Sequence, residues 1–223
     1  MRGLKGWLES QSSYAHSPEE ADVFLFNSRH HIREVARIKR FYPNKPFIHR
    51  LDGPMRIYNR MSDWRDRVVN IANDLIADGT VFQSSWSREM NLSLGLKPTS
   101  FETVIINAPN PDIFNNKGKA PFGSGPKVRL VAVSWSMNKK KGFDVYRWLD
   151  ENLDFNQYEM FFFGNSPVRF KNIKIIPPVG GEELAVELKK CDVYITASSA
   201  EACSNTLVEA LHCGLPVLVI GTT

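Results

Sequence analysis

Cysteine is scarce in this chain, and its spacing argues against two common roles. Three cysteines occur among 223 residues, Cys191, Cys203 and Cys213, and none of them forms a Cys-x-x-Cys pair. Structural zinc sites use such closely spaced ligands, so we expect no zinc site. A sparse, odd number of cysteines also favours a reducing compartment over a disulfide framework. We therefore expect a cytoplasmic protein whose cysteines are small packing residues.

Long apolar runs and long basic runs are also missing. No stretch of about eighteen apolar residues appears, so we expect no membrane span. The first residues, 1–7, lack the apolar core of a secretory signal. The formal charge is only +4, and lysine and arginine are scattered apart from Lys139–Lys141. This pattern gives no support to nucleic-acid binding, whereas an anionic ligand or peripheral contact with an acidic membrane fits it.

Four familiar motifs are absent, and each absence removes a class of function. The chain has no G-x-x-x-x-G-K-[ST] and no G-x-G-x-x-G after a strand, which argues against P-loop NTPases and NAD dehydrogenases. It has no Gly-x-Ser-x-Gly, which argues against an α/β-hydrolase. It also has no Asp-x-Asp, the pair that would hold a metal-bound diphosphate.

What the chain does contain is a regular alternation of strand and helix patterns. Short apolar runs typical of buried parallel strands alternate with segments of helical spacing. In the first half the expected strands are 23–27, 46–50, 80–82 and 103–106, and the expected helices are 30–41, 64–77 and one capped by Ser85. In the second half the strands are 127–134, 159–163, 172–176 and 193–196, and the helices are 142–153 and 181–190.

A stretch rich in glycine, proline and polar residues, 117–126, separates the two series and is typical of a linker. We therefore expect two domains, 1–120 and 121–223. Alternating strands and helices favour parallel sheets with right-handed crossovers. The expected fold class is α/β, with two Rossmann-like domains whose ligands bind at the carboxyl ends of the strands.

The most informative segment follows the expected strand 193–196. Glu201 and Glu209 stand with seven residues between them, and a small polar turn, Ser204-Asn205-Thr206, lies between the two. An apolar helical pattern then leads to Gly214-Leu-Pro216 and a further apolar strand. This order places a helix N-terminus at the carboxyl edge of a parallel sheet, where free backbone N–H groups and the helix dipole favour phosphate.

These residues resemble the E-x7-E signature of retaining, GT-B-fold glycosyltransferases of the family 4 type. The likeness includes the alanine that follows Glu209 and the Cys-Gly-x-Pro-Val ending. The resemblance implies two domains with parallel sheets facing across a cleft, the first for the acceptor and the second for a nucleotide-sugar donor. It also implies that the chain is cut at both ends, because the family's first strand with its glycine-rich loop and its returning C-terminal helix have no counterpart here.

The resemblance assigns donor-side roles to a set of residues in the second domain. Glu201 would contact the transferred sugar near the reacting carbon, and Glu209 would hold the ribose of the nucleotide. The backbone of Ser204, Asn205 and Thr206 would bind the diphosphate. Lys141 of the Lys141-Gly142 pair, with Lys140 or Lys139, would neutralise it, since the family's upstream arginine falls near Ser136. Gly164 and Asn165 resemble a turn that lines the nucleotide pocket.

In the first domain the resemblance implies a catalytic contact and an acceptor side. His49, expected at the end of its strand, would touch the sugar, and Arg50 and Asp52 are acceptor-side candidates. A lone histidine is more often structural, so both roles stay open for His49. The acceptor would be a saccharide or a lipid-linked saccharide.

The function expected from these residues is transfer of a sugar from a nucleoside-diphosphate sugar to an acceptor hydroxyl, with retention of configuration and without a metal. We expect a hexosyltransferase that needs no cofactor and uses a UDP-sugar rather than a GDP- or ADP-sugar. Two alternatives remain, a non-catalytic nucleotide-sugar-binding fragment and a GT-B-fold nucleotide-sugar epimerase.

Overall fold

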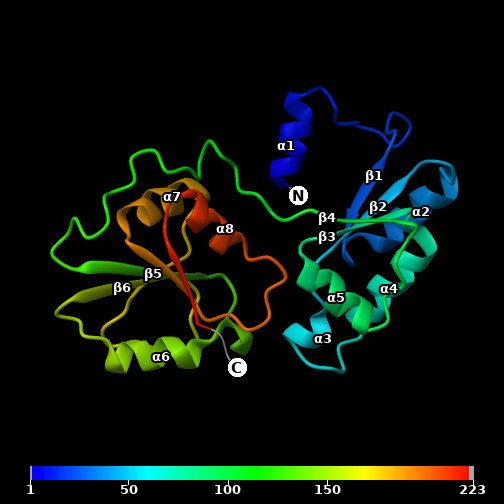
Figure 1. Ribbon diagram of the computed structural model, residues 1–223. Helices are drawn as coiled ribbons and strands as arrows, with labels where there is room; N and C mark the ends of the chain where they lie inside the picture. Colours follow the sequence, from blue (N-terminus) through cyan, green and yellow to red (C-terminus); the bar gives the residue numbers. More distant parts are fainter. Residues whose placement is uncertain (1, 221–223) are drawn as a thin grey trace. The chain divides into compact units, whose positions relative to one another are not determined.

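The computed structural model describes residues 2–220 and has an α/β architecture with two separate parallel sheets (Figure 1). The chain divides into two compact units, Met1–Ile106 and Asn107–Thr223. The α/β class with two parallel sheets is therefore confirmed. Among the described residues, no helix is both long and apolar enough to cross a bilayer.

Unit 1 is built on a four-stranded sheet of order β1-β2-β3-β4, in which every neighbouring pair is parallel. Its elements are α1 (Arg2–Ser10), β1 (Phe24–Asn27), α2 (Ile32–Phe41), β2 (Phe47–Leu51), α3 (Met55–Tyr58), α4 (Arg65–Ile76), β3 (Gly79–Phe82), α5 (Ser85–Ser93) and β4 (Phe101–Val104).

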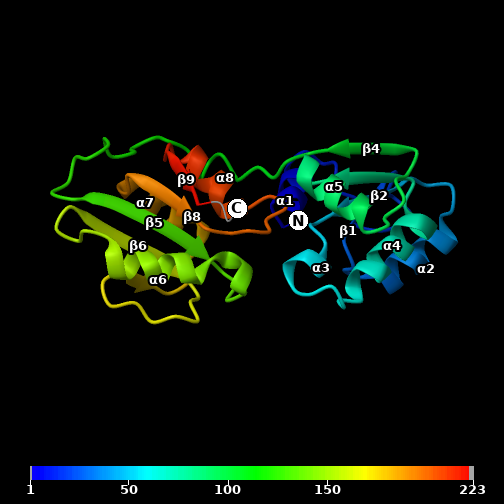
Figure 2. The same cartoon turned by 60° about the horizontal axis from the view of Figure 1, so that its bottom comes forward.

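The core of unit 1 forms where alternate strand residues meet its helices. Phe26 and Phe47 pack on Ala72 and Ile76 of α4 and on the apolar side of α2, while Leu51 and Phe82 pack near Val69 and Leu96. Figure 2 shows α2 and α4 on the same side of these strands. Because the strands follow one another in a single direction, right-handed crossovers put their helices on one face.

Unit 2 carries a five-stranded parallel sheet of order β7-β6-β5-β8-β9. Its elements are β5 (Val128–Ser134), the 3-10 turn η1 (Lys139–Lys141), α6 (Phe143–Asn152), β6 (Tyr158–Gly164), β7 (Lys174–Ile176), α7 (Gly181–Lys190), β8 (Val193–Thr196), α8 (Asn205–His212) and β9 (Val217–Val219).

Both faces of the second sheet are covered, because the strand order reverses beside β5. Leu130 and Ala132 pack with Phe143 and Tyr146 of α6, whereas Val131 packs with Leu188 of α7 and with α8. Figure 1 shows α6 on one side of β5 and β6, and α7 and α8 on the other. Continuous apolar strands such as β5 are therefore buried on both faces, as the pattern of the sequence predicts.

The unit boundary differs from the predicted one at 120/121, since it lies at 106/107. Residues 107–120 belong to unit 2 because they pack on it. Phe114 lies in its core, the Lys119 ammonium donates to the Cys191 carbonyl at 2.7 Å, and the Ala120 N–H donates to the Lys189 carbonyl at 3.0 Å. The glycine and proline content of 117–126 marks an irregular surface segment of unit 2 and not a boundary.

Two local predictions are also corrected. Ser84, and not Ser85, caps α5, because its hydroxyl accepts the Ser87 N–H at 3.0 Å. The fourth strand lies two residues earlier than the apolar run 103–106 predicts. Its pairing with β3 starts at Phe101 opposite Gly79 and ends at Val104 opposite Phe82.

Candidate functional site

The candidate donor site lies in unit 2, where the strand order reverses. Successive strands β5, β6 and β7 extend the sheet one way, while β8 and β9 extend it the other way from β5. Open parallel sheets bind ligands outside the carboxyl ends of the strands at such a switch point. The loops after β5 and β8 lie at this switch point, and they contain Lys141 and Glu201 respectively.

Helix α8 begins in the loop after β8, and side chains hold its first turn in place. The Ser204 hydroxyl accepts the Leu207 N–H at 3.4 Å, and the Thr206 hydroxyl bonds to that of buried Tyr194 at 2.8 Å. The Asn107 amide donates to the Cys203 carbonyl at 3.2 Å and to Asn205 Oδ1 at 2.8 Å. The first N–H groups of a helix have no intrahelical acceptor, so the fixed turn presents them to a ligand.

The turn that holds Lys141 packs directly against the loop after β8. Gly142 has a φ of 74°, and a Cβ there would lie 2.3 Å from the Ala197 carbonyl oxygen. The Ser199 N–H donates to the Lys140 carbonyl at 2.9 Å. Glycine after Lys141 is thus required both by the left-handed backbone and by the close approach of residue 197. This explains physically why the lysine is followed by glycine.

The packing brings Lys141 and Glu201 into contact although sixty positions separate them in the sequence. The Lys141 ammonium forms an ion pair with the Glu201 carboxylate, and their side chains are only 18% and 25% exposed. The side chains of Lys139 and Lys140 are exposed, while their backbone forms η1. Of the three predicted cations, Lys141 is therefore the one built into the site.

Glu209 lies within α8, as predicted, and is half-buried. Burial raises the pKa of its carboxyl above the usual value, because desolvation disfavours the charged form. Within residues 2–220 no hydrogen bond or ion pair to this carboxylate is present. Glu209 therefore differs from Glu201, whose charge is already balanced by Lys141.

Gly164 and Asn165 form a turn that is locked to the end of β5. Gly164 has a φ of 115°, and a Cβ there would lie 2.0 Å from the Ser134 carbonyl oxygen. Asn165 donates from its backbone to the Ser134 carbonyl at 2.8 Å and from its side chain to the Trp135 carbonyl at 2.9 Å. A shallow apolar hollow, too tight to hold a water molecule, adjoins this turn and is lined by Val133, Trp135, Phe163, Gly164, Pro178, Val179 and Leu184.

His49 does not lie at an open edge of the first sheet, where the prediction placed it. It occupies the middle of β2 and is fully buried, with its ring stacked on Phe26 at 4.2 Å. Its two ring nitrogens lie 3.1 Å from Asn73 Oδ1 and 2.9 Å from the Ser28 carbonyl oxygen. Burial lowers its pKa, despite these hydrogen bonds. In this structure the ring supports the core and contacts no open space.

Arg50 and Asp52 lie together at the carboxyl end of β2, as predicted. The Asp52 carboxylate accepts from Arg50 Nη1 and Asn27 Nδ2, both at 3.3 Å, and from the Gln83 amide. Arg50 Nη1 also donates to Asn27 Oδ1 at 2.7 Å. Both charged groups are thus engaged with protein partners, and their first role is to fix this edge of the sheet.

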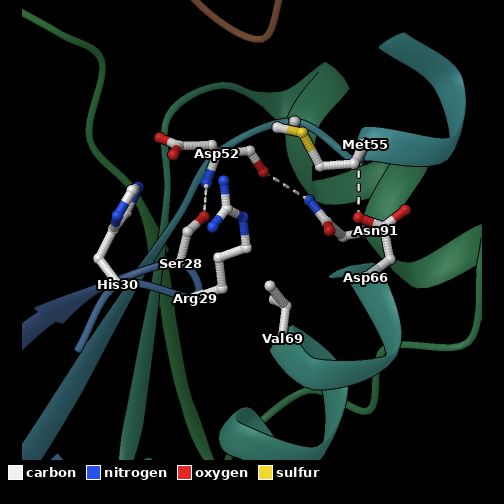
Figure 3. Close-up of a pocket in the computed structure, with 9 residues that line it drawn as sticks. Ser28, Arg29, His30, Asp52, Met55, Asp66, Val69 and Asn91 are labelled. Atoms are coloured by element: carbon white, nitrogen blue, oxygen red, sulfur yellow. Dashed lines mark hydrogen bonds between the residues drawn. The ribbon is translucent and has the colours of Figure 1, made fainter. Parts of the chain in front are cut away.

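A pocket that opens to solvent, with about 40 Å³ of space accessible to water, lies beside these residues (Figure 3). Its lining comes from the ends of β1 and β2 and from α3, α4 and α5, namely Ser28, Arg29, His30, Asp52, Gly53, Met55, Asp66, Val69 and Asn91. No local motif marks most of these residues, because two strand ends and three helices far apart in the chain supply them.

Three residues that support the candidate donor site also escaped prediction. Asn107 holds the entry to α8, Tyr194 anchors Thr206, and the Tyr146 hydroxyl accepts the Ala197 N–H at 3.2 Å. Burial raises the pKa of Tyr146 to about 12, so it stays protonated. Their partners lie twelve or more positions away in the sequence, so no local motif reveals them. In the described part of the chain no three metal-binding side chains cluster together.

No family model and no curated protein matches the chain. Solved structures of GT-B glycosyltransferases do match it. Sucrose-phosphate synthase from Thermosynechococcus elongatus is 16% identical with a TM-score of 0.70, over 98% of this chain and 60% of that one. HepE from Anabaena, in complex with UDP and glucose, is 15% identical with a TM-score of 0.69, over 96% and 61%.

A UDP-forming α,α-trehalose-phosphate synthase from Burkholderia xenovorans is 12% identical with a TM-score of 0.64, over 99% of this chain and 62% of that one. At these identities the likeness shows the fold, and the chain spans about three fifths of the length of these structures. The GT-B type of fold expected from the sequence is thereby confirmed.

Proposed function

We propose that this chain binds a nucleoside-diphosphate sugar at the carboxyl edge of the second sheet and transfers the sugar to an acceptor hydroxyl with retention of configuration. One observation carries the proposal: Lys141, Glu201 and the N-terminus of α8, from separate parts of the sequence, meet at the switch point of the sheet. Cation, carboxylate and free N–H groups together suit a diphosphate joined to a hydroxylated ring.

The proposed roles follow from the charge and partners of each group. The α8 N–H groups and Lys141 would bind the diphosphate and stabilise the negative charge that grows on it as the sugar leaves. This protein charge takes the part that a metal plays in other sites, so the proposed reaction requires none. Glu209, unpartnered in the described chain and half-buried, would accept hydrogen bonds from the ribose hydroxyls.

Glu201 would contact the transferred sugar once the diphosphate shares Lys141. The bond between the anomeric carbon and the diphosphate oxygen breaks, and a bond from that carbon to the acceptor oxygen forms on the same face. The acceptor proton passes to the departing diphosphate. The Glu201 carboxylate stabilises the positive charge that develops on the sugar ring during this exchange.

The nucleotide base would lie against the apolar surface beside Gly164, with the Trp135 indole, 56% exposed, at its rim. A flat aromatic base suits an apolar wall next to an exposed indole. We propose a UDP-sugar as donor, supported by the similar HepE structure that contains UDP-glucose. A hexosyl group and a saccharide or lipid-linked acceptor complete the proposal.

Calorimetric titration with UDP-, GDP- and ADP-glucose tests the donor site. Wild type should bind one nucleotide class, and Glu209→Ala should weaken that binding by about 10- to 100-fold, as expected for lost hydrogen bonds to a charged group. Glu183→Ala is the matched control, because Glu183 is an exposed glutamate near the start of α7. Absence of binding by all three donors to folded protein would overturn the proposal.

Product analysis then separates transfer from the two alternatives. Incubation with the bound donor and candidate acceptors should give a glycoside of unchanged anomeric configuration and free nucleoside diphosphate. An isomerised donor with no acceptor consumed would show an epimerase instead. Donor binding with neither product would favour the non-catalytic binder.

A further inference from the structure

We infer that the pocket of unit 1 shown in Figure 3 binds the oxyanion of a small hydroxylated molecule, a sugar phosphate or a sugar acid, with Arg29 as the anion-binding residue. The binding claim stands on the residues of unit 1 alone. That the bound molecule is the acceptor of the transfer rests on the proposed function.

The carboxylates of this pocket already have protein donors. Asp66 accepts the N–H groups of Met55 and Arg56, both at 2.8 Å, and so fixes the start of α3. Asp52 is engaged by Arg50, Asn27 and Gln83. Figure 3 shows the Asp52 carboxylate on the opposite side of its backbone from Asn91. Both carboxylates are thus hydrogen-bonded to protein donors, and neither forms an ion pair with Arg29 in the described chain.

Arg29 lines the pocket as an exposed residue two positions after the end of β1. No hydrogen bond or ion pair to its guanidinium is present within residues 2–220. Figure 3 shows the side chain reaching up between Ser28 and Val69, among the other lining residues. A guanidinium can bind a phosphate or carboxylate through two parallel hydrogen bonds, so an oxyanion is the partner that suits Arg29 best.

Asn91 gives independent support, because it is a buried polar side chain with an unused acceptor in the same pocket. It is only 5% exposed, and its amide nitrogen donates to the Asp52 carbonyl at 3.0 Å and to the Ser87 carbonyl at 2.8 Å. These two bonds fix the amide orientation. Its Oδ1 has no donor in the described chain, and Figure 3 shows it turned toward Val69 and the interior of the pocket.

Together the two groups define the chemistry of the ligand. Arg29 requires a negative charge, while Asn91 Oδ1, which can only accept, requires a hydroxyl or another donor. A molecule with hydroxyl groups and one oxyanion satisfies both at once. A neutral sugar gives Arg29 no negatively charged partner. Inorganic phosphate offers Asn91 Oδ1 few hydrogen-bond donors.

Calorimetry with glucose 6-phosphate, glucuronate and glucose tests this inference on the whole chain. We expect the two anionic sugars to bind and glucose to bind at least tenfold more weakly. The anionic sugar that binds more tightly shows whether the pocket prefers a phosphate or a carboxylate. Equal affinity for glucose, or no binding of either anion, would overturn the inference.

Three variants locate the binding. Arg29→Gln should weaken the anionic sugar about fivefold to tenfold, while Arg37→Gln, which removes the same charge from an exposed position on α2, should leave it unchanged. Lys141→Gln should also leave it unchanged, because Lys141 belongs to the donor site. Equal losses in Arg29→Gln and Arg37→Gln, or a loss in Lys141→Gln alone, would contradict the assignment.

The outcomes separate this inference from the proposed function. Failure of UDP-sugar binding with intact, Arg29-dependent binding of the anionic sugar would remove the donor proposal and keep the pocket. Donor binding that depends on Glu209, with no effect of Arg29→Gln on any sugar, would keep the donor proposal and remove the anion-binding pocket.

Discussion

The two units contain the same kind of parallel sheet but differ in the direction in which the strands are added. In unit 1 the strands follow in order, and both core clusters lie on the face covered by α2, α4 and α5. In unit 2 the order reverses beside β5, and helices cover both faces. A reversal of strand order separates the helices that flank neighbouring strands, and only unit 2 has such a switch point in the described sheets.

The two units also differ in the partners of individual residues that the sequence singled out. In unit 1, His49, Arg50 and Asp52 are all engaged with protein partners. In unit 2, Glu209 is half-buried without a partner in the described chain, and its pKa is raised. Buried polar groups are normally satisfied, so an unsatisfied one at a switch point favours ligand binding.

The largest effect is expected at Gly142, whose substitution should damage unit 2 alone. Gly142 and Gly118 share a φ of 74°, but only at Gly142 would a Cβ meet a neighbour, the Ala197 carbonyl oxygen at 2.3 Å. Gly118→Ala should cost about 1 kcal/mol from the left-handed backbone. Gly142→Ala should cost about 3 kcal/mol, since overpacking adds to that strain. Chemical denaturation measures both, and equal costs would show that the turn does not pack as described.

The next effect concerns the ion pair between Lys141 and Glu201. If a diphosphate competes with Glu201 for Lys141, Glu201→Gln should bind free UDP about threefold to tenfold more tightly, because a nearby negative charge is removed. Lys141→Gln should bind UDP more weakly by a similar factor. Calorimetry checks both values, with Glu183→Gln as the control. Weaker UDP binding by Glu201→Gln would mean that Glu201 holds the nucleotide directly.

A smaller effect should appear in unit 1 at acid pH. Burial lowers the folded-state pKa of His49, so its contribution to stability is present above the unfolded pKa, near 6.5, and is lost as pH falls through the folded value. The unfolding free energy of unit 1 should fall by up to about 1.4 kcal/mol per pH unit in that window. His49→Gln should flatten this slope, whereas His16→Gln, at an exposed position, should not. If His49→Gln left the pH dependence of the unfolding free energy unchanged, His49 would not be the buried, neutral group that causes it.

The smallest effect is a gain in stability on removing the charge of Glu209. Its folded-state pKa is raised, so protonation stabilises the folded state, and the ionised form is the less favourable one at neutral pH. Glu209→Gln should therefore raise the Tm at pH 7 while it weakens nucleotide binding. The gain should shrink as pH falls through the raised pKa. A lower Tm at pH 7 would show that Glu209 stabilises the unliganded helix.

Sequence patterns predicted the helices and strands well where periodicity and flanking residues agree. The segments Gly181–Lys190 and Val193–Thr196 match the structure to the residue. The position of Glu209 within a helix and of Glu201 ahead of it also followed from local pattern. These features depend on neighbours within a few residues, and such signals are readable from one sequence.

Features that depend on distant contacts could not be predicted in the same way. The burial of His49 needs Asn73 and Phe26, which surround it only after folding. The pairing of Lys141 with Glu201 requires the adjacency of β5 and β8, which no periodicity encodes. The pocket around Arg29 and Asn91 draws on three helices and two strand ends, so its existence is a property of the folded unit.

Backbone amide shifts during titration with UDP-glucose test the central claim most directly. We expect large shifts for residues 204–207, 141–142 and 164–165 of unit 2, and none for residues 28–30 and 91 of unit 1. These shifts should be much smaller in Glu209→Ala at a UDP-glucose concentration that half-saturates the wild type. Shifts confined to unit 1, or no shifts at any concentration in the folded chain, would contradict a nucleotide-sugar site at the carboxyl edge of the second sheet.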